Sequence, residues 1–181
     1  MMELIRFDIE GPVLIKPRVF EDERGYFYET FNAGAFQKEG LEIGFVQDNQ
    51  SLSKTGTLRG LHFQNPPFAQ GKLIRVVSGS VFDVIIDIRP NSPTFGQSLK
   101  MEINGKNKFM LWIPPGFAHG FLTLEDNTLF LYKCTQLYNK QAESGIIWND
   151  KDLSIEWPLE TPIVSEKDLQ LTTLKNCENR F

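Results

Sequence analysis

The sequence is poor in histidine and cysteine, with two residues of each among 181. Barrels that bind a catalytic metal need several neutral imidazoles with a carboxylate, and His62 and His119 alone do not supply them, so metal catalysis is not expected. Neither Cys134 nor Cys177 lies near a histidine in the sequence, and no Gly-x-Ser-x-Gly motif occurs, which speaks against a cysteine or serine nucleophile. So few cysteines favour a protein of the reducing cytoplasm.

The sequence also lacks a long apolar run and an excess of positive charge. No run of about 18 apolar residues is present, so a membrane-spanning helix is not expected. The first four residues do not resemble a secretory signal. The formal net charge is -4 and the pI is near 5.3, whereas nucleic acids and anionic membranes bind a broad cationic face. We therefore expect neither partner, and any anionic ligand must meet a local cluster of cations.

The composition predicts one folded domain over residues 1–181. Hydrophobic residues make up 41% of the chain and aromatic residues 12%, enough for a sizeable core in a chain of this length. No internal repeat, linker or low-complexity segment interrupts the sequence. A single compact domain is therefore expected.

Short apolar runs separated by glycine and proline predict an all-β fold. The expected strands are 13–19, 26–31, 45–52, 58–63, 72–78, 80–89, 98–103, 109–113, 120–124 and 128–136. Their spacing is typical of an antiparallel sandwich or barrel. Helical periodicity is scarce, and short helices are expected only at 33–39 and 150–155.

The segment 57–75 concentrates one of the histidines with three cations. In a regular strand the side chains of Arg59 and His62 would face opposite ways. Gly60 lies between them, and a glycine inside a strand often marks a β-bulge, which would bring both side chains into one cavity. The alternative is a core histidine that is hydrogen-bonded for stability, with Arg59 reaching solvent.

Other polar residues on the expected strands extend this picture. Asp83 and Asp87 fall on one face of the strand 80–89, so Asp83 is expected to point into the barrel, either in a catalytic role or in an ion pair with Lys72 or Arg75. A histidine of near-neutral pKa, a lysine for an oxyanion and a tyrosine as a weak acid suffice to remove a proton next to a carbonyl and return one.

Two tyrosines are candidates for that acid. Tyr132 lies on the expected strand 128–136, and Tyr138 lies just beyond it. A buried tyrosine is often a core residue with a tethered hydroxyl, and that alternative remains open for both. If Tyr132 acts as the acid, its face of the strand must be the inner one.

Several ordered blocks of the sequence share a pattern with one known family. They are 58–64, 71–73, 83–84, 87–89, 92–96, 114–121 and 148–150, within a match from about residue 11 to residue 168. In these blocks the chain resembles the dTDP-4-dehydrorhamnose 3,5-epimerase family. The resemblance implies a cupin-type antiparallel jelly-roll barrel with a few short helices, which works without a metal or other cofactor. It also implies a homodimer.

The resemblance further implies a role for each matching residue. His62 matches the catalytic base, and Asp168 the carboxylate that orients it. Tyr132 matches the acid on the opposite face of the sugar, and Lys72 the cation beside the C4 carbonyl oxygen. The substrate contacts that the resemblance implies are Arg24, Phe27, Glu29, Gln47, Asp48, Asn49, Arg59, His119, Tyr138, Glu143 and Lys167. Among them, Arg24 is expected to reach across the dimer to the pyrophosphate, and Phe27 and Tyr138 to flank the thymine.

The implied reaction is epimerisation at C3 and C5 of dTDP-4-dehydro-6-deoxy-D-glucose, giving dTDP-4-dehydro-L-rhamnose, by proton abstraction next to the 4-keto group. Inversion needs a proton from the face opposite the base, so a second group such as Tyr132 is required. Two alternatives remain open. One is a related epimerase that inverts only C3 or only C5 of a dTDP-4-keto-6-deoxysugar, and the other is a catalytically silent cupin that binds nucleotide sugars.

Overall fold

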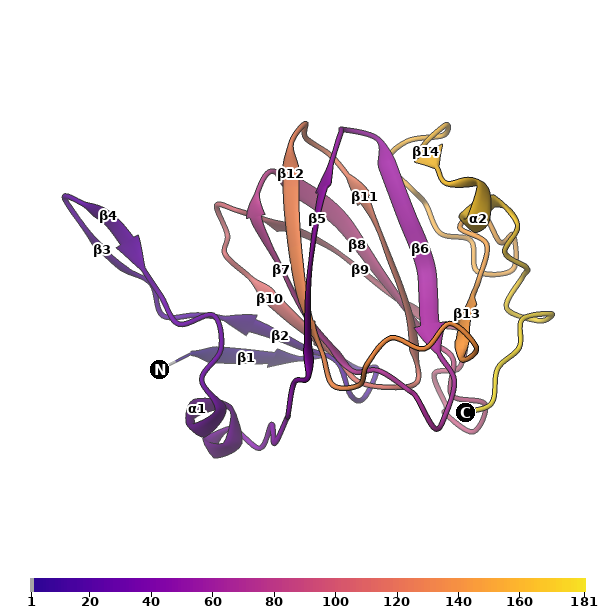
Figure 1. Ribbon diagram of the computed structural model, residues 1–181, viewed down its shortest axis with the longest axis horizontal. Coiled ribbons are helices and arrows are strands. Elements are labelled where there is room, and N and C mark those ends of the chain that lie inside the picture. Colours follow the sequence, from indigo (N-terminus) through magenta and orange to yellow (C-terminus); the bar gives the residue numbers. More distant parts are fainter. Residues whose placement is uncertain (1) are drawn as a thin grey trace.

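The computed structural model describes residues 2–181, and strands dominate it (Figure 1). The strands are β1 (Glu3–Arg6), β2 (Val13–Lys16), β3 (Phe20–Asp22), β4 (Gly25–Phe27), β5 (Gln47–Ser53), β6 (Thr57–Gln64), β7 (Lys72–Ser78), β8 (Ser80–Asp87), β9 (Ser98–Asn104), β10 (Met110–Ile113), β11 (Phe117–Thr123), β12 (Thr128–Cys134), β13 (Glu143–Gly145) and β14 (Ile163–Val164). The helices are α1 (Ala33–Lys38) and α2 (Glu166–Leu169). Within residues 2–181, no helix has the length and apolarity needed to cross a membrane.

The structure confirms the all-β fold and corrects some boundaries. Each expected strand corresponds to one of β2 and β4 to β12, although β4 covers only the start of 26–31. The helix expected at 33–39 is α1, whereas the helix expected at 150–155 is wrong. That segment forms turns, because Asp150 accepts hydrogen bonds from the backbone N–H groups of Asp152 and Leu174 instead of continuing a helical ladder.

The strands form two main sheets and a separate hairpin. The first sheet has the order β1-β2-β10-β7-β12-β5, and the second has the order β13-β6-β11-β8-β9, with β14 paired in parallel to β6. All other pairings between these strands are antiparallel. The two sheets agree with the antiparallel sandwich or barrel that the strand spacing predicts and with the jelly roll that the family resemblance implies.

An apolar interior fills the space between the two sheets. Alternation along each strand sends one set of side chains inward: Ile74 and Val76 from β7 meet Val81 and Ile85 from β8, around the ring of Phe130 from β12. These residues are almost fully buried. Polar residues two positions away from these apolar ones point inward as well. Lys72 on β7 and Tyr132 on β12 are examples, and a cavity between the sheets can collect them.

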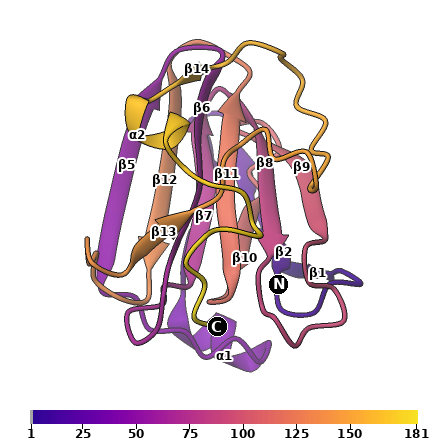
Figure 2. The same ribbon diagram turned by 90° about the vertical axis from the view of Figure 1, so that its right-hand side faces the viewer.

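Each sheet is also covered on its outer side. Phe36 of α1 packs against the outer side of the first sheet, in a cluster with Trp112. The C-terminal segment crosses the outer side of the second sheet, where Leu174 and Phe181 pack on a cluster that includes Phe63 (Figure 2). Because this segment runs beside β6, α2 reaches the strand that carries His62.

Candidate active site

A bulge in β6 gives the site its shape. His119 of β11 pairs with His62 and Phe121 with Arg59, so three steps along β6 oppose two steps along β11. Gly60 lies at this bulge with φ +117°, and a Cβ atom there would stand 2.6 Å from the Cα of Gly120. Only glycine tolerates both the conformation and the close approach. The bulge predicted from the sequence is confirmed, and Arg59 and His62 line the same cavity.

That cavity, called here the inner cavity, has a volume of about 630 Å³. Its walls come from both sheets and from the C-terminal segment. The candidate residues that line it are Asn49, Arg59, His62, Lys72, His119, Tyr132, Lys167 and Asp168. Eight of the residues expected from the sequence therefore meet in one place, although they are spread over more than 100 positions of the chain.

His62 is held by Asp168 at the wall of the inner cavity. The Nε2 atom of His62 lies 2.8 Å from Oδ1 of Asp168, whose Oδ2 accepts the backbone N–H of Gly60 at 3.2 Å. Ser165 caps α2 by accepting the N–H of Asp168. Burial tends to raise the pKa of Asp168, but its hydrogen bond and charge interaction with His62, together with the hydrogen bonds from Gly60 and Ser165, outweigh that effect, so the pKa is lowered. An ionised carboxylate on Nε2 leaves Nδ1 of His62 for proton transfer.

Lys72 brings a buried positive charge to the same cavity. It projects from β7 and its Nζ donates a hydrogen bond to the backbone carbonyl of His62, at 3.4 Å. Burial lowers the pKa of Lys72, while Cys134, Asp83 and Glu143 act in the opposite direction. A cation in such a water-poor site can stabilise negative charge on a nearby oxygen far better than one in bulk water.

Tyr132 lies on the opposite sheet from His62. It projects inward from β12 together with Phe130, whose ring centroid lies 6.1 Å from its own. The face of β12 that carries Tyr132 is therefore the inner one, as its role as an acid requires. Burial raises the pKa of Tyr132, with Cys134 adding to the increase and Arg59 opposing it. The hydroxyl stays protonated at neutral pH and can act as a proton donor.

His119 forms a second histidine–aspartate pair. Its Nε2 atom lies 2.9 Å from Oδ2 of Asp83, and both residues are buried. The ring of His119 stacks on Phe130 at an interplanar angle of 24°. Asp83 does point into the barrel, but the expected ion pair with Lys72 or Arg75 is wrong, because the oxygen that has a partner binds His119. Sequence spacing carries no signal for this pair, which joins β8 to β11 across 36 positions.

Polar residues at the rim of the cavity are bonded to one another. Glu143 accepts hydrogen bonds from the hydroxyl of Tyr138 at 2.8 Å and from Nζ of Lys167 at 2.6 Å. Burial would raise the pKa of Glu143, but the bonds from Lys167 and Tyr138 lower it. The side-chain amide of Gln47 donates to Asn49 at 3.0 Å and accepts the backbone N–H of Tyr138 at 2.9 Å. This network joins β5, β13 and α2 around the opening.

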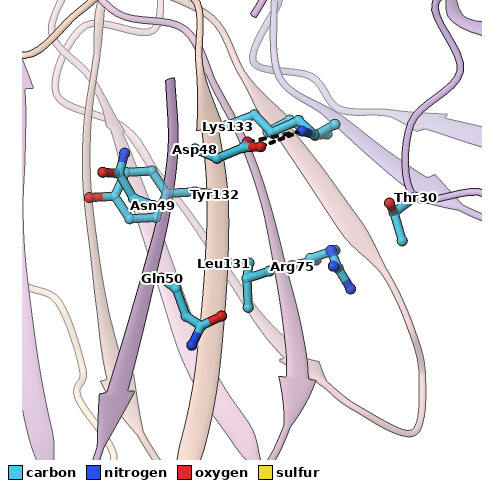
Figure 3. A pocket seen from close by; sticks show the side chains of 9 residues that line it. Thr30, Asp48, Asn49, Gln50, Arg75, Leu131, Tyr132 and Lys133 are labelled. Carbon is cyan, nitrogen blue, oxygen red and sulfur yellow. Dashed lines mark hydrogen bonds and ion pairs between the residues drawn. The ribbon is translucent and has the colours of Figure 1, made fainter. Parts of the chain in front are cut away.

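Asp48 lies on the other face of the first sheet. Between the inward-facing Gln47 and Asn49, its carboxylate points outward and binds Nζ of Lys133 at 2.9 Å. Both residues line a separate outer pocket of about 240 Å³, together with Arg75 and Thr30 (Figure 3). Figure 3 shows the side chains of Tyr132 and Asn49 on the opposite side of the strands from Arg75. The side chain of Asp48 is thus not part of the inner cavity.

Three expected contacts lie on or beside the β3–β4 hairpin, which projects away from the barrel (Figure 1). The side chain of Arg24 is 85% exposed and binds Asp22 at 2.6 Å. Phe27 is 66% exposed, and Glu29 accepts a hydrogen bond from Asn32. Within the described chain these residues do not line the inner cavity.

Comparison with known proteins identifies the family of this architecture. A sequence model of dTDP-4-dehydrorhamnose 3,5-epimerase matches residues 6–176. The chain belongs to the dTDP-4-dehydrorhamnose 3,5-epimerase family. It is 50% identical to the dTDP-4-dehydrorhamnose 3,5-epimerase of Shigella flexneri over 169 residues, which cover 93% of each chain.

Solved structures extend this family relationship. A dTDP-6-deoxy-D-glucose-3,5-epimerase from Legionella pneumophila, determined in complex with dTDP-4-keto-L-rhamnose, superposes with a TM-score of 0.93 at 45% identity, covering 97% of this chain and 94% of that one. A 3'-monoepimerase from Streptomyces bikiniensis, in complex with dTDP-quinovose, gives 0.89 at 31% identity, covering 93% and 86%. The expected cupin-type fold is confirmed, and the solved structures that resemble this chain include a 3,5-epimerase and a 3'-monoepimerase.

Some features of the site have no clear signal in the sequence. The helix α2 has only four residues and so shows no periodicity, although Ser165 three positions before Asp168 is a capping signal that could have indicated it. The aromatic lining of the cavity, Phe121 stacked on Phe130 at 4.1 Å, joins residues of two sheets. Such contacts follow from the fold, and no local pattern predicts them.

Proposed function

We propose that the chain inverts C3 and C5 of dTDP-4-dehydro-6-deoxy-D-glucose and releases dTDP-4-dehydro-L-rhamnose, without a metal or other cofactor. The observation that carries the proposal is the arrangement of three groups around one cavity. His62 stands on the second sheet and is held by Asp168 of α2, Tyr132 stands on the first sheet, and Lys72 of the first sheet lines the same cavity. A base and an acid on opposite walls are what inversion at a carbon requires.

The chemistry follows from the 4-keto group. When Nδ1 of His62 takes the proton from C5, the electrons of the C–H bond move into the C4–C5 bond and onto the carbonyl oxygen. Lys72 stabilises the resulting enolate by a charge-assisted hydrogen bond. Asp168 stabilises the imidazolium, and the hydroxyl of Tyr132 returns a proton to the other face of C5. The same base then acts at C3, which also lies next to the carbonyl.

The rival reactions have less support. The 3,5-epimerases named above are 45% and 50% identical to this chain, whereas the 3'-monoepimerase is 31% identical. A silent binding protein would not need the His62–Asp168 pair, the buried Lys72 and the protonated Tyr132 to be kept together. The first observation favours double inversion over single inversion, and the second favours an enzyme over a silent binder.

The substrate's nucleotide end is proposed to bind at a homodimer interface. Phe20, Tyr26 and Phe27 of the projecting hairpin are 50%, 55% and 66% exposed, an unusual display of aromatic surface that a second subunit would cover. The same hairpin carries Arg24, whose only ionic partner within residues 2–181 is the neighbouring Asp22. In a dimer, Arg24 would reach the diphosphate of a substrate in the partner's cavity, where Arg59 and Lys167 supply further positive charge.

The experiment that tests the reaction is incubation with dTDP-4-dehydro-6-deoxy-D-glucose in deuterated water. Mass spectrometry and proton NMR of the recovered sugar then count and locate the deuterium. Deuterium at both C3 and C5, with inverted product, is the expected result. A label confined to one carbon would replace the proposal with a single-site epimerase, and no label with tight dTDP binding would make the chain a silent binder.

A further inference from the structure

The two histidine–aspartate pairs of the cavity differ in one respect. Both oxygens of Asp168 have partners, Nε2 of His62 and the N–H of Gly60. Asp83 binds His119 through Oδ2 alone, and its Oδ1 is buried without any hydrogen-bond partner among residues 2–181. The side chain of Asp83 has no solvent exposure. A buried carboxylate oxygen without a partner is costly, so compensation by a nearby cation is expected.

The surroundings of Asp83 are otherwise apolar. It projects from β8 between Val81 and Ile85, which both belong to the interior cluster. Its partner His119 lies against the rings of Phe130 and Phe121, each with a centroid 6.2 Å from its own. In such low-dielectric surroundings, the charge of Asp83 acts at longer range than a charge in water.

Lys72 lines the inner cavity together with His119, the partner of Asp83. Three acidic groups oppose the effect of burial on the pKa of Lys72: Cys134 on β12, Asp83 on β8 and Glu143 on β13. The Nζ atom of Lys72 also donates a hydrogen bond to the backbone carbonyl of His62 on β6. Burial raises the pKa of Cys134, so at neutral pH its thiol carries no charge.

The second acidic group is already engaged. Glu143 is bound by Lys167 and Tyr138 at the rim of the cavity, and both of its oxygens are used in those bonds. Of these three groups, Asp83 is the one with a carboxylate oxygen that has no hydrogen-bond partner among residues 2–181. The other titratable or charged groups that line the same cavity are Arg59, His62, His119, Tyr132, Lys167 and Asp168.

We propose that Asp83 is a positioning residue for the reaction, a single buried carboxylate that fixes His119 through Oδ2 and compensates the positive charge of Lys72 through Oδ1. It is not among the residues that line the inner cavity. The inference rests on the proposed role of Lys72 at the C4 oxygen. It assigns the orientation of His119 and the charge of Lys72 to one residue behind the cavity wall.

The test is the pH dependence of C5 deuterium exchange in Asp83→Asn, measured with the full-length protein and saturating substrate. Asparagine keeps the shape and one acceptor oxygen but removes the charge. Without that charge the pKa of Lys72 falls further, so activity should be lost at lower pH. We expect the alkaline limb of kcat to move down by about one pH unit, which is about tenfold in rate above the limb, with KM little changed.

Asp87→Asn is the matched control. Asp87 lies on the same strand and the same face as Asp83, and its side chain is equally inaccessible to solvent. Its carboxylate binds Arg89, Ser92 and Thr94 instead, at the end of the barrel. Those bonds overcome the effect of burial and lower its pKa to about 2. Asp87→Asn should lower the melting temperature and leave the alkaline limb in place. Asp83→Glu, which restores the charge, should return the limb towards its wild-type position.

The arms of this experiment separate two failures. If Lys72→Met keeps full exchange, the proposed role of Lys72 is wrong. If Lys72→Met loses exchange but Asp83→Asn titrates like wild type, the inference about Asp83 is overturned while the proposed function stands. The same comparison is repeated in Tyr132→Phe protein, where titration of a tyrosine at position 132 cannot contribute to the alkaline limb. Should neither Asp83→Asn nor Asp83→Ser fold, the carboxylate is a folding determinant and the proposal is also overturned.

Discussion

The inner cavity and the β3–β4 hairpin carry candidate residues under opposite conditions. At the cavity, His62 is hydrogen-bonded to Asp168 at 2.8 Å and His119 to Asp83 at 2.9 Å. Packed strands surround both pairs. On the hairpin, Arg24 and Phe27 are largely exposed, and Arg24 is bound only to its neighbour Asp22 among the described residues. The first group is preorganised within one chain, and the second is not.

This difference separates chemistry from recognition. Proton transfer needs groups held within a few tenths of an ångström, which a closed barrel provides. Binding a nucleotide diphosphate needs reach and positive charge, which an extended hairpin can offer to a neighbouring subunit. Variants of the two regions test whether they separate in this way, beginning with the change that should have the largest effect.

Replacing the base should remove the chemistry and leave recognition almost intact. In His62→Asn, deuterium exchange at C3 and C5 should fall together by about a thousandfold or more, since one base is proposed to serve both carbons. Affinity for dTDP, measured by calorimetry, should stay within about tenfold, roughly 1.4 kcal/mol. Exchange that persists at either carbon would reveal a second base, and the proposal that His62 serves both carbons would then be wrong.

Removing the acid should divide the reaction into its two halves. Tyr132→Phe keeps the ring that packs on Phe130 and removes only the proton that the hydroxyl supplies. With His62 and Lys72 unchanged, the enolate should still form, and His62 can return a deuteron to the face it came from. Epimerised product should fall about a hundredfold while much of the C5 exchange remains.

The control for this variant is Tyr138→Phe, which loses the bond to Glu143 but leaves the cavity wall intact. It should retain inversion. A parallel loss of exchange and inversion in Tyr132→Phe would assign that residue to binding or enolate formation. If neither falls, the acid lies elsewhere, and Tyr138 is the first candidate.

Arg24 should have a smaller effect, and one that another subunit can repair. Arg24→Ala should raise KM about tenfold, because a partly exposed contact to a diphosphate is lost while the cavity is untouched. Mixing Arg24→Ala with His62→Ala protein under subunit exchange should restore about a quarter of wild-type activity, since half of the dimers are mixed and one of their two sites has both residues intact.

Arg18→Ala is the control for the hairpin. Arg18 is also an arginine at its base, placed over the ring of Phe20 at 4.6 Å, and it is not among the proposed substrate contacts. Its variant should not complement His62→Ala beyond the activity it already has alone. If native mass spectrometry detects mixed dimers that gain no activity, Arg24 acts in its own subunit or outside the site.

The same contrast accounts for how far structure and site follow from the sequence. Strand positions follow from local alternation. The bulge at Gly60 follows as well, because a glycine between Arg59 and His62 in an apolar run is typical of a bulged strand. His62, Lys72 and Tyr132 could be predicted because such groups are unusual on strands that are largely apolar. The family resemblance added their roles, and it alone indicated Asn49, Lys167 and Asp168.

Contacts made at long range could not be predicted from the sequence. The partner of Asp83 is on another strand 36 positions away, and the outward direction of Asp48 depends on the register of β5 at the sheet edge. The turn at 150–155 is set by a hydrogen bond from Leu174 to Asp150, in the C-terminal segment. Each of these features depends on residues that are distant in the sequence. The local pattern alone is compatible with another structure and does not predict it.

Metal removal should have the smallest effect, and it tests the two regions at once. In the cavity, both histidines already use Nε2 to bind a carboxylate, and burial keeps the thiol of Cys134 protonated. Within residues 2–181 no cluster of three or more histidine, cysteine or acidic side chains could hold a metal ion. Exhaustive chelation should therefore leave kcat within about twofold of its starting value, and elemental analysis should find no stoichiometric transition metal.

A metal ion could still affect substrate binding at the β3–β4 hairpin, and kinetics would distinguish that effect from one in the inner cavity. Mg²⁺ binds diphosphate oxygens readily and could accompany the substrate to the hairpin, where it would compete with or assist Arg24. That would change KM while kcat stays constant, and Arg24→Ala would alter the dependence. A kcat that falls on chelation and recovers only with one particular transition metal would instead contradict the proposed proton-transfer mechanism, since it would require a metal at the reacting carbons where His62, Lys72 and Tyr132 are proposed to suffice.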